Sequence, residues 1–222
     1  MIDTIVVSGG NIQEDFALDF LKKTEEKQGK MPYLIAADKG LEFFLHTGIC
    51  PDMAVGDFDS LSDEGEEFLK SLENTEICRL RPEKDDSDTQ SAVCRAAERG
   101  GKNIVLFGCL GTRLDHIFAN MGLLVWGQQR GIRVFIYDRY NYITMIESGT
   151  VLKRKEQFGK YVSFFSLGGD VSGLTLKGFK YPLNCHYLKV SDCGLTVSNE
   201  ISEEEAEVTF DSGNLVMIMS RD

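Results

Sequence analysis

The sequence lacks the cysteine pairs and the long apolar runs that mark several classes of protein. Its six cysteines are scattered without a C-x-x-C pair, and its three histidines do not have the spacing of metal ligands. This distribution argues against a disulfide framework and against structural zinc. No apolar run approaches the roughly 18 residues of a membrane-spanning helix. We therefore expect buried, reduced thiols and no membrane partner.

Positive charge is also scarce. The 24 lysines and arginines are outnumbered by 35 aspartates and glutamates, which gives a net charge of −11. Because clustered basic residues supply most of the affinity for nucleic acid, we expect no nucleic-acid partner. If the substrate carries phosphate, a divalent metal would have to supply positive charge, and a cationic co-substrate would be well received.

The first residues, MIDTIVVSGGN, have no basic region ahead of an apolar one and run directly into a predicted strand. We therefore expect no signal peptide and a cytoplasmic location. The 222 residues are enough for one large domain or two modest ones with a proper core.

Two patterns divide the chain. Over residues 1–140, short and continuously apolar β-type runs alternate with helical stretches. This pattern predicts a Rossmann-like α/β domain with a mostly parallel sheet buried on both faces. Residues 141–222 hold short β-type runs separated by Gly, Asp, Ser and Asn, with no helix of plausible length between them. They predict a small all-β sandwich domain.

Charged residues follow the predicted strands of the first domain, at the point where each strand ends. In parallel sheets covered by helices, ligands bind beyond the carboxyl ends of the strands, so we expect these side chains to share one site. They are Asp38 and Lys39 in AADKG, Asp57 and Asp59 in GDFDS, Lys84, Asp85, Asp86 and Asp88 in KDDSD, and Arg113, Asp115 and His116 in GTRLDH.

Asp57 and Asp59 flank Phe58. In an extended chain, side chains two residues apart point the same way, so both carboxylates would converge while Phe58 turns back and anchors the loop in the core. Two such carboxylates repel each other unless a cation lies between them, and Mg²⁺ prefers these oxygen ligands. Taken alone, GDFDS is better explained as a solvated turn, and the other strand ends are what favour a metal site.

In KDDSD, Asp85 and Asp88 lie three residues apart at the start of a predicted helix and would therefore share one face. The alternative is an acidic first turn that complements the helix dipole.

The segment GCLGTRLDH suits phosphate binding. Its glycines allow close approach, and Arg113 supplies a planar cationic fork. Asp115 is placed to cap the following helix, which is also its alternative explanation. His116 is either a phosphate contact or a polar residue of the first helical turn. The SGGN segment after the first predicted strand could also bring backbone amides close to a ligand.

With these motifs in place, the chain resembles the thiamine pyrophosphokinase family. The match is carried, in order, by AADKG (36–40), PDMAVGDFDSL (51–61), KDDSDTQSAV (84–93), GCLGTRLDHIFANMGLL (108–124), GLTLKGFKYPL (173–183) and TVSNE (196–200). The resemblance implies an α/β catalytic domain and a β-sandwich domain that helps to bind thiamine. It also implies Mg²⁺ dependence, transfer of the diphosphate of ATP to the hydroxyethyl group of thiamine with release of AMP, and a homodimer with active sites at the subunit interface.

The family's site residues are carried over motif by motif. The resemblance implies metal-centred carboxylates, a nucleotide-side group and part of a thiamine pocket. The first group consists of Asp57, Asp59 and Asp85, with Asp88 beside them as a catalytic residue; the second of Arg113, Asp115 and His116; the third of Ser198 and Asn199. From their positions at the strand ends, the further candidate binding residues are Asp38, Lys39 and Lys84.

This sequence departs from the family pattern at two places. Ser87 precedes Asp88 where the family often has threonine, a change that keeps the hydroxyl. The single tryptophan, Trp126, lies in a predicted helix of the first domain, whereas some relatives present one to thiamine from the C-terminal half. The aromatic residue that stacks on thiamine is therefore left open.

Two other functions are compatible with the scaffold. One is a diphosphotransferase that acts on another hydroxymethyl acceptor, such as a pterin. The other is a non-catalytic module that binds nucleotide or thiamine. The complete set of carboxylates favours catalysis, and the KGFKYPL and SNE segments favour thiamine.

Overall fold

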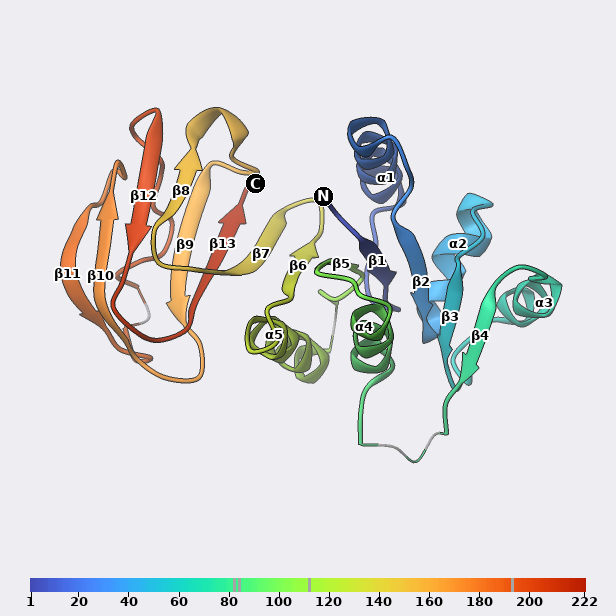
Figure 1. Cartoon of the computed structure of the whole chain (residues 1–222). Helices are drawn as coiled ribbons and strands as arrows, with labels where there is room; N and C mark the ends of the chain where they lie inside the picture. The colour runs from blue at the N-terminus through green and yellow to red at the C-terminus, as the bar shows by residue number, and fades with distance from the viewer. Residues whose placement is uncertain (82, 84, 112, 193) are drawn as a thin grey trace. The chain divides into compact units, whose positions relative to one another are not determined.

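The computed structural model describes residues 1–81, 83, 85–111, 113–192 and 194–222 (Figure 1). The chain divides into two compact units, Met1–Arg139 and Tyr140–Asp222. Within the described residues, no helix combines the length and the apolar character needed to cross a membrane.

The first unit is built on a parallel sheet with strand order β4-β3-β2-β1-β5-β6. The strands are β1 Thr4–Val7, β2 Tyr33–Ala37, β3 Met53–Gly56, β4 Glu76–Arg79, β5 Asn103–Phe107 and β6 Arg133–Tyr137. The helices between them are α1 Glu14–Gln28, α2 Leu41–Thr47, α3 Asp63–Ser71, α4 Asp88–Glu98 and α5 Leu114–Gln128, with the 3₁₀ turn η1 at Asp38–Gly40. The predicted Rossmann-like parallel sheet is confirmed.

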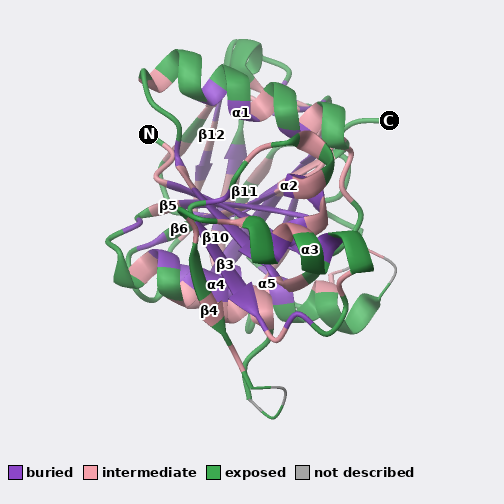
Figure 2. Ribbon diagram, turned by 90° about the vertical axis from the view of Figure 1, so that its right-hand side faces the viewer, coloured by how far each residue is buried: buried purple, intermediate pink, exposed green. Residues whose placement is uncertain are grey.

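Helices cover both faces of this sheet, which explains why its central strands are buried and mostly apolar (Figure 2). Ile5 and Val7 of β1 face the core beneath α1, α2 and α3, where Phe44 is fully buried. Val6, between them, is also fully buried and points to the face that α4 covers. The chain order reverses between β1 and β5, and such a switch point is where open α/β sheets place their ligands.

The second unit contains two antiparallel sheets, with strand orders β7-β13-β9 and β11-β10-β12-β8. Their strands are β7 Asn141–Ile146, β8 Thr150–Lys153, β9 Tyr161–Ser166, β10 Val171–Lys177, β11 Leu183–Leu188, β12 Glu205–Thr209 and β13 Leu215–Ser220, with a 3₁₀ turn η2 at Arg154–Glu156. Phe164 of one sheet and Leu174 of the other share a single core, so the unit is a β-sandwich, as predicted.

Candidate active site

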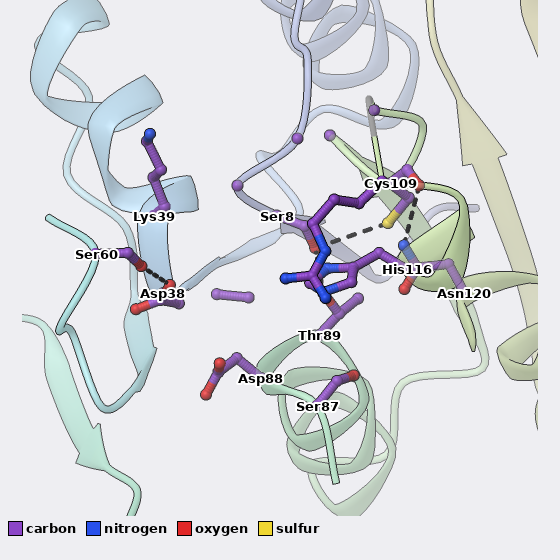
Figure 3. A pocket seen from close by; sticks show the side chains of 16 residues that line it. Ser8, Asp38, Lys39, Ser60, Ser87, Asp88, Thr89, Cys109, His116 and Asn120 are labelled. Carbon is purple, nitrogen blue, oxygen red and sulfur yellow. Dashed lines mark hydrogen bonds between the residues drawn. The ribbon is translucent and has the colours of Figure 1, made fainter. Parts of the chain in front are cut away.

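A pocket of about 270 Å³ opens at the carboxyl ends of β1, β2 and β5 (Figure 3). Its lining comes from the loop after β1, from η1, from the first turns of α4 and α5, and from the loop after β5. The lining side chains include Ser8, Asp38, Lys39, Ser60, Ser87, Asp88, Thr89, Cys109, Arg113, His116 and Asn120. The sequence predicted that charged side chains from several strand ends lie together. The structure supports this prediction for those that line the pocket.

Glycine lets the backbone loops of the pocket floor touch one another. Gly108 has φ +67°, and a Cβ there would collide with the carbonyl oxygen of Ser8. A Cβ on Gly40 would likewise collide with the carbonyl of Val7. Because no side chain fits between them, the loops after β1, β2 and β5 form one continuous backbone surface open to a ligand.

Three carboxylates form the acidic end of the site. Asp38, Asp57 and Asp59 each offer an oxygen, and these oxygens lie within 4.8 Å of one another. Asp38 accepts a hydrogen bond from the Ser60 hydroxyl through Oδ2, while its Oδ1 is buried without a hydrogen-bond partner among the described residues. A buried carboxylate oxygen without a donor is costly, so this oxygen is suited to a ligand that the protein itself does not supply.

Charge repulsion within this group raises the pKa of one member. The pKa of Asp59 is raised, first by the neighbouring charge of Asp57 and then by partial desolvation and by the charges of Asp38 and Asp88. A hard divalent cation with oxygen ligands would relieve that repulsion, so the residues present fit such an ion.

The backbone reaches this arrangement by a different route from the one predicted. Phe58 has φ +63°, a left-handed conformation, so the expectation of an extended Asp-Phe-Asp segment was wrong. The left-handed turn still brings both carboxylates together, and the Asp59 amide donates a hydrogen bond to Asp57 Oδ1 at 3.2 Å. Phe58 is 5% exposed and packs in the core of the first unit, which confirms its role as the anchor of the loop.

Helix α4 begins at Asp88, three residues after Asp85, which was predicted to lie at the start of the helix. Ser87 is its N-cap, and the Ser87 hydroxyl accepts a hydrogen bond from the Gln90 amide at 3.1 Å. Asp88 is the first helical residue and lines the pocket, whereas Asp85 precedes the helix and is exposed. The prediction that Asp85 and Asp88 share a helical face was therefore wrong. Asp85 is not in the three-carboxylate group, and Lys84 lies outside the described residues.

Arg113 and Asp115 form an ion pair at the start of α5. Nε of Arg113 donates to Asp115 Oδ1 at 3.2 Å, and Nη2 donates to Oδ2 at 2.5 Å. The hydrogen bond from Arg113 lowers the pKa of Asp115 to about 2. The N-cap position belongs to Arg113, so the prediction of Asp115 as the cap was wrong. Arg113 and His116 line the pocket, while Asp115 orients the guanidinium that faces it.

Sequence reasoning did not single out the neutral polar side chains of the pocket. Ser8 Oγ and Thr89 Oγ1 are hydrogen-bonded at 2.8 Å, which ties the loop after β1 to α4. The Cys109 thiol donates to Ser8 Oγ at 3.7 Å, and Asn120 Nδ2 donates to the Cys109 carbonyl at 3.0 Å. One signal could have revealed Asn120, because it lies four residues after His116 and therefore on the same helical face.

Ser198 and Asn199 lie in the second unit. The Asn199 side chain is 2% exposed and is used within the fold, because its Oδ1 accepts from the amides of Tyr181 and Glu200 and its Nδ2 donates to the Tyr181 carbonyl. Ser198 has φ +55° and is exposed, with its amide bonded to Ser163 Oγ at 2.9 Å. Asn199 therefore shapes the loop, and Ser198 is the member of the pair that presents its side chain to solvent.

Carboxylates that need a cation and backbone loops open to phosphate, brought together at the switch point of a parallel sheet, are typical of enzymes that transfer phosphoryl groups from nucleotides. Two family models narrow this class. Residues 24–136 match "Thiamin pyrophosphokinase, catalytic domain", and residues 149–215 match "Thiamin pyrophosphokinase, vitamin B1 binding domain". The chain belongs to the thiamine pyrophosphokinase family, a family of enzymes, which confirms the resemblance seen in the sequence.

Individual relatives agree with this assignment. The chain is 35% identical over 189 residues to thiamine pyrophosphokinase of Bacillus subtilis (strain 168), covering 85% of this chain and 87% of that protein. The crystal structure of thiamine pyrophosphokinase from Bacillus subtilis matches with a TM-score of 0.85 at 31% identity, over 99% of both chains. That from Geobacillus thermodenitrificans matches with a TM-score of 0.83 at 29% identity, over 100% of this chain and 98% of that one.

Proposed function

We propose that the protein transfers the terminal diphosphate of ATP to the hydroxyethyl oxygen of thiamine, giving thiamine diphosphate and AMP. The family assignment supports the reaction, and the convergence of Asp38, Asp57 and Asp59 beside the pocket is the observation that carries it. The three carboxylates repel one another, so their convergence is unfavourable unless a cation lies between them.

Mg²⁺ is the cation that these carboxylates suit best, and Asp38, Asp57 and Asp59 would hold it. When bound, it would neutralise charge on the diphosphate and make the β-phosphorus more electrophilic. The orphaned Oδ1 of Asp38 supports adding this residue to the predicted ligand set. Asp85 remains a predicted ligand.

The first unit supplies the groups that position ATP. Backbone amides of the loop after β1 and the N-terminus of α4, an 11-residue helix, offer hydrogen-bond donors to phosphate. Arg113, oriented by Asp115, adds a cationic fork at the same pocket. Such positioning, more than covalent help from the protein, accelerates the transfer.

In the transfer itself, the thiamine hydroxyl oxygen forms a bond to the β-phosphorus while the bond from that phosphorus to the α,β-bridging oxygen breaks. AMP leaves with the bridging oxygen, and the hydroxyl proton goes to a base. We assign Asp88 to accept or relay this proton, because it lines the pocket and lies close enough to Asp59 to influence its pKa.

We assign thiamine recognition to the second unit, whose residues 149–215 match the vitamin B1 binding model. Ser198 is the predicted contact, and Asn199 holds the segment that carries it. By family resemblance we further propose a homodimer with active sites at the subunit interface. A cytoplasmic location is proposed too, supported by five free cysteines among the described residues.

The test is incubation of the protein with ATP, Mg²⁺ and thiamine, followed by chromatography for AMP and thiamine diphosphate. Both products should form in equal amounts, and omission of Mg²⁺ should abolish them. Parallel reactions replace thiamine with a hydroxymethyl pterin. AMP release with the pterin and not with thiamine would indicate the other diphosphotransferase function. Calorimetric binding of thiamine and ATP without product would instead indicate a non-catalytic module and overturn the proposal.

A further inference from the structure

The side chain of Asn120 faces the pocket from the second turn of α5 and is 6% exposed (Figure 3). We propose that its carboxamide oxygen accepts a hydrogen bond from the nucleoside part of ATP and so helps the enzyme to select its nucleotide. This inference rests on the proposed function, because it assumes that ATP occupies this pocket.

The orientation of the carboxamide is fixed by one contact. Nδ2 donates to the Cys109 carbonyl at 3.0 Å, so the amide group cannot turn over without setting two oxygens against each other. Oδ1 therefore points away from Cys109, and this oxygen receives no hydrogen bond from the residues that the structure describes. This oxygen is not among the fully enclosed side-chain atoms that lack a partner, so it reaches the pocket, where a ligand that brings a donor can bond to it.

The required donor decides which part of the ligand lies here. Phosphate oxygens and an amide oxygen are all acceptors, so Oδ1 cannot bind the triphosphate. ATP carries N–H and O–H donors only on its 6-amino group and on the hydroxyls of its ribose. Asn120 therefore faces the base or the sugar.

The neighbouring groups agree with this placement. Asp38 and Asp88, at the acidic end, lie on the opposite side of the pocket from Asn120 in the close view (Figure 3). Cys109, beside Asn120, is 2% exposed, and burial raises the pKa of its thiol to about 12, so it stays neutral. A neutral floor with one oriented acceptor suits a nucleoside better than a charged group.

The experiment compares ATP with three analogues that each lack one donor: purine riboside triphosphate, 2′-deoxy-ATP and 3′-deoxy-ATP. Thiamine and Mg²⁺ are held at saturation. The wild-type enzyme should lose about tenfold in kcat/KM with the analogue whose missing donor contacts Asn120. Purine riboside triphosphate tests the base, and the two deoxynucleotides test the sugar.

Asn120→Leu removes the acceptor and keeps the approximate volume. In this variant, the analogue that lacks the donor to Asn120 should have a kcat/KM less than about threefold below that of ATP. The reason is that the donor and the acceptor of the same hydrogen bond are then both absent. Cys109→Ala is the matched control: it disturbs the same floor but keeps the carbonyl that holds Asn120, so the preference among the four nucleotides should persist.

Two results would overturn the proposal. One is a wild-type enzyme that uses all four nucleotides equally, a measurement that needs no variant to fold. The other is an equal loss with every nucleotide in Asn120→Leu, which would show that Asn120 acts only by positioning the loop at Cys109. If AMP does not form even with ATP, the proposed function fails, and calorimetric binding of the same four nucleotides still tests the contact.

Discussion

The Asp57–Asp59 loop of the first unit and the Ser198–Asn199 loop of the second use polar residues in opposite ways. In the first, carboxylates face one another, one pKa is raised by repulsion, and an oxygen of Asp38 is left without a partner among the described residues. In the second, the Asn199 carboxamide makes three hydrogen bonds to the backbone. The first loop is destabilised by repulsion that a cation would relieve, and the second contributes stability to its own fold.

The sharpest test of this difference is Asp59→Asn. The substitution removes one proposed metal ligand and one of the repelling charges, so we expect turnover to fall by far more than tenfold while the fold is kept. Product formation and circular dichroism are measured on the same preparation. A variant that retains more than about a tenth of the wild-type rate would refute the ligand role.

Phe58→Ala, one residue away, should have the reverse effect. Removing a buried aromatic ring from the core should lower the free energy of unfolding by about 3 kcal/mol. Urea titration gives the stability, and kcat is measured at a low temperature where the variant stays folded. Loss of turnover in a fully folded variant, with unchanged stability, would contradict the anchoring role.

In the second unit, Asn199→Ala removes three hydrogen bonds and should cost about 2 kcal/mol of stability. Ser198→Ala is the matched control, because among the described residues Ser198 is bonded through its backbone amide and not through its hydroxyl. The free energy of unfolding of this variant should change by less than about 0.5 kcal/mol. If Ser198 contacts thiamine, the Ser198→Ala enzyme should have a higher KM for thiamine and an unchanged KM for ATP. If both substitutions lowered the free energy of unfolding equally, Asn199 and Ser198 would not have the different roles assigned to them.

The smallest effect concerns pH. In the folded protein the pKa of Asp59 is raised above its ordinary value of 3.8, first by the charge of Asp57, so the fold favours the protonated form. Stability of the metal-free protein is therefore lost as pH rises from 3.8 through the folded pKa. In EDTA at pH 7, Asp59→Asn should melt slightly above wild type, and the difference should vanish below pH 3.8. Added Mg²⁺ should stabilise only the wild type, and a lower melting temperature for the metal-free variant would contradict the repulsion.

Much of this organisation follows from local sequence patterns. Continuous apolar runs such as Ile5–Val7 predicted a sheet buried on both faces, and the polar residues after each strand predicted the edge where the pocket lies. A strand pattern extends over several residues. The predicted sheet and the predicted edge therefore stay the same when the predicted end of a strand is wrong by one or two residues.

What the sequence could not supply depends on single backbone angles and on residues far apart in the chain. The left-handed conformation of Phe58 is unusual for a bulky residue, and the start of α4 at Asp88 depends on one hydroxyl, that of Ser87. The partnership of Asn120 with Cys109 is a tertiary contact inside an apolar helix, where an asparagine gives little local signal.

The contacts between glycine loops on the pocket floor also limit how the enzyme could be redesigned. No residue with a Cβ fits at Gly40 or Gly108 without moving the backbone of a neighbouring strand end. A library that varies these two glycines would therefore yield mainly misfolded proteins. Altered nucleotide preference has to be sought on the helices that face the floor, and Asn120 is the first position at which to look for it.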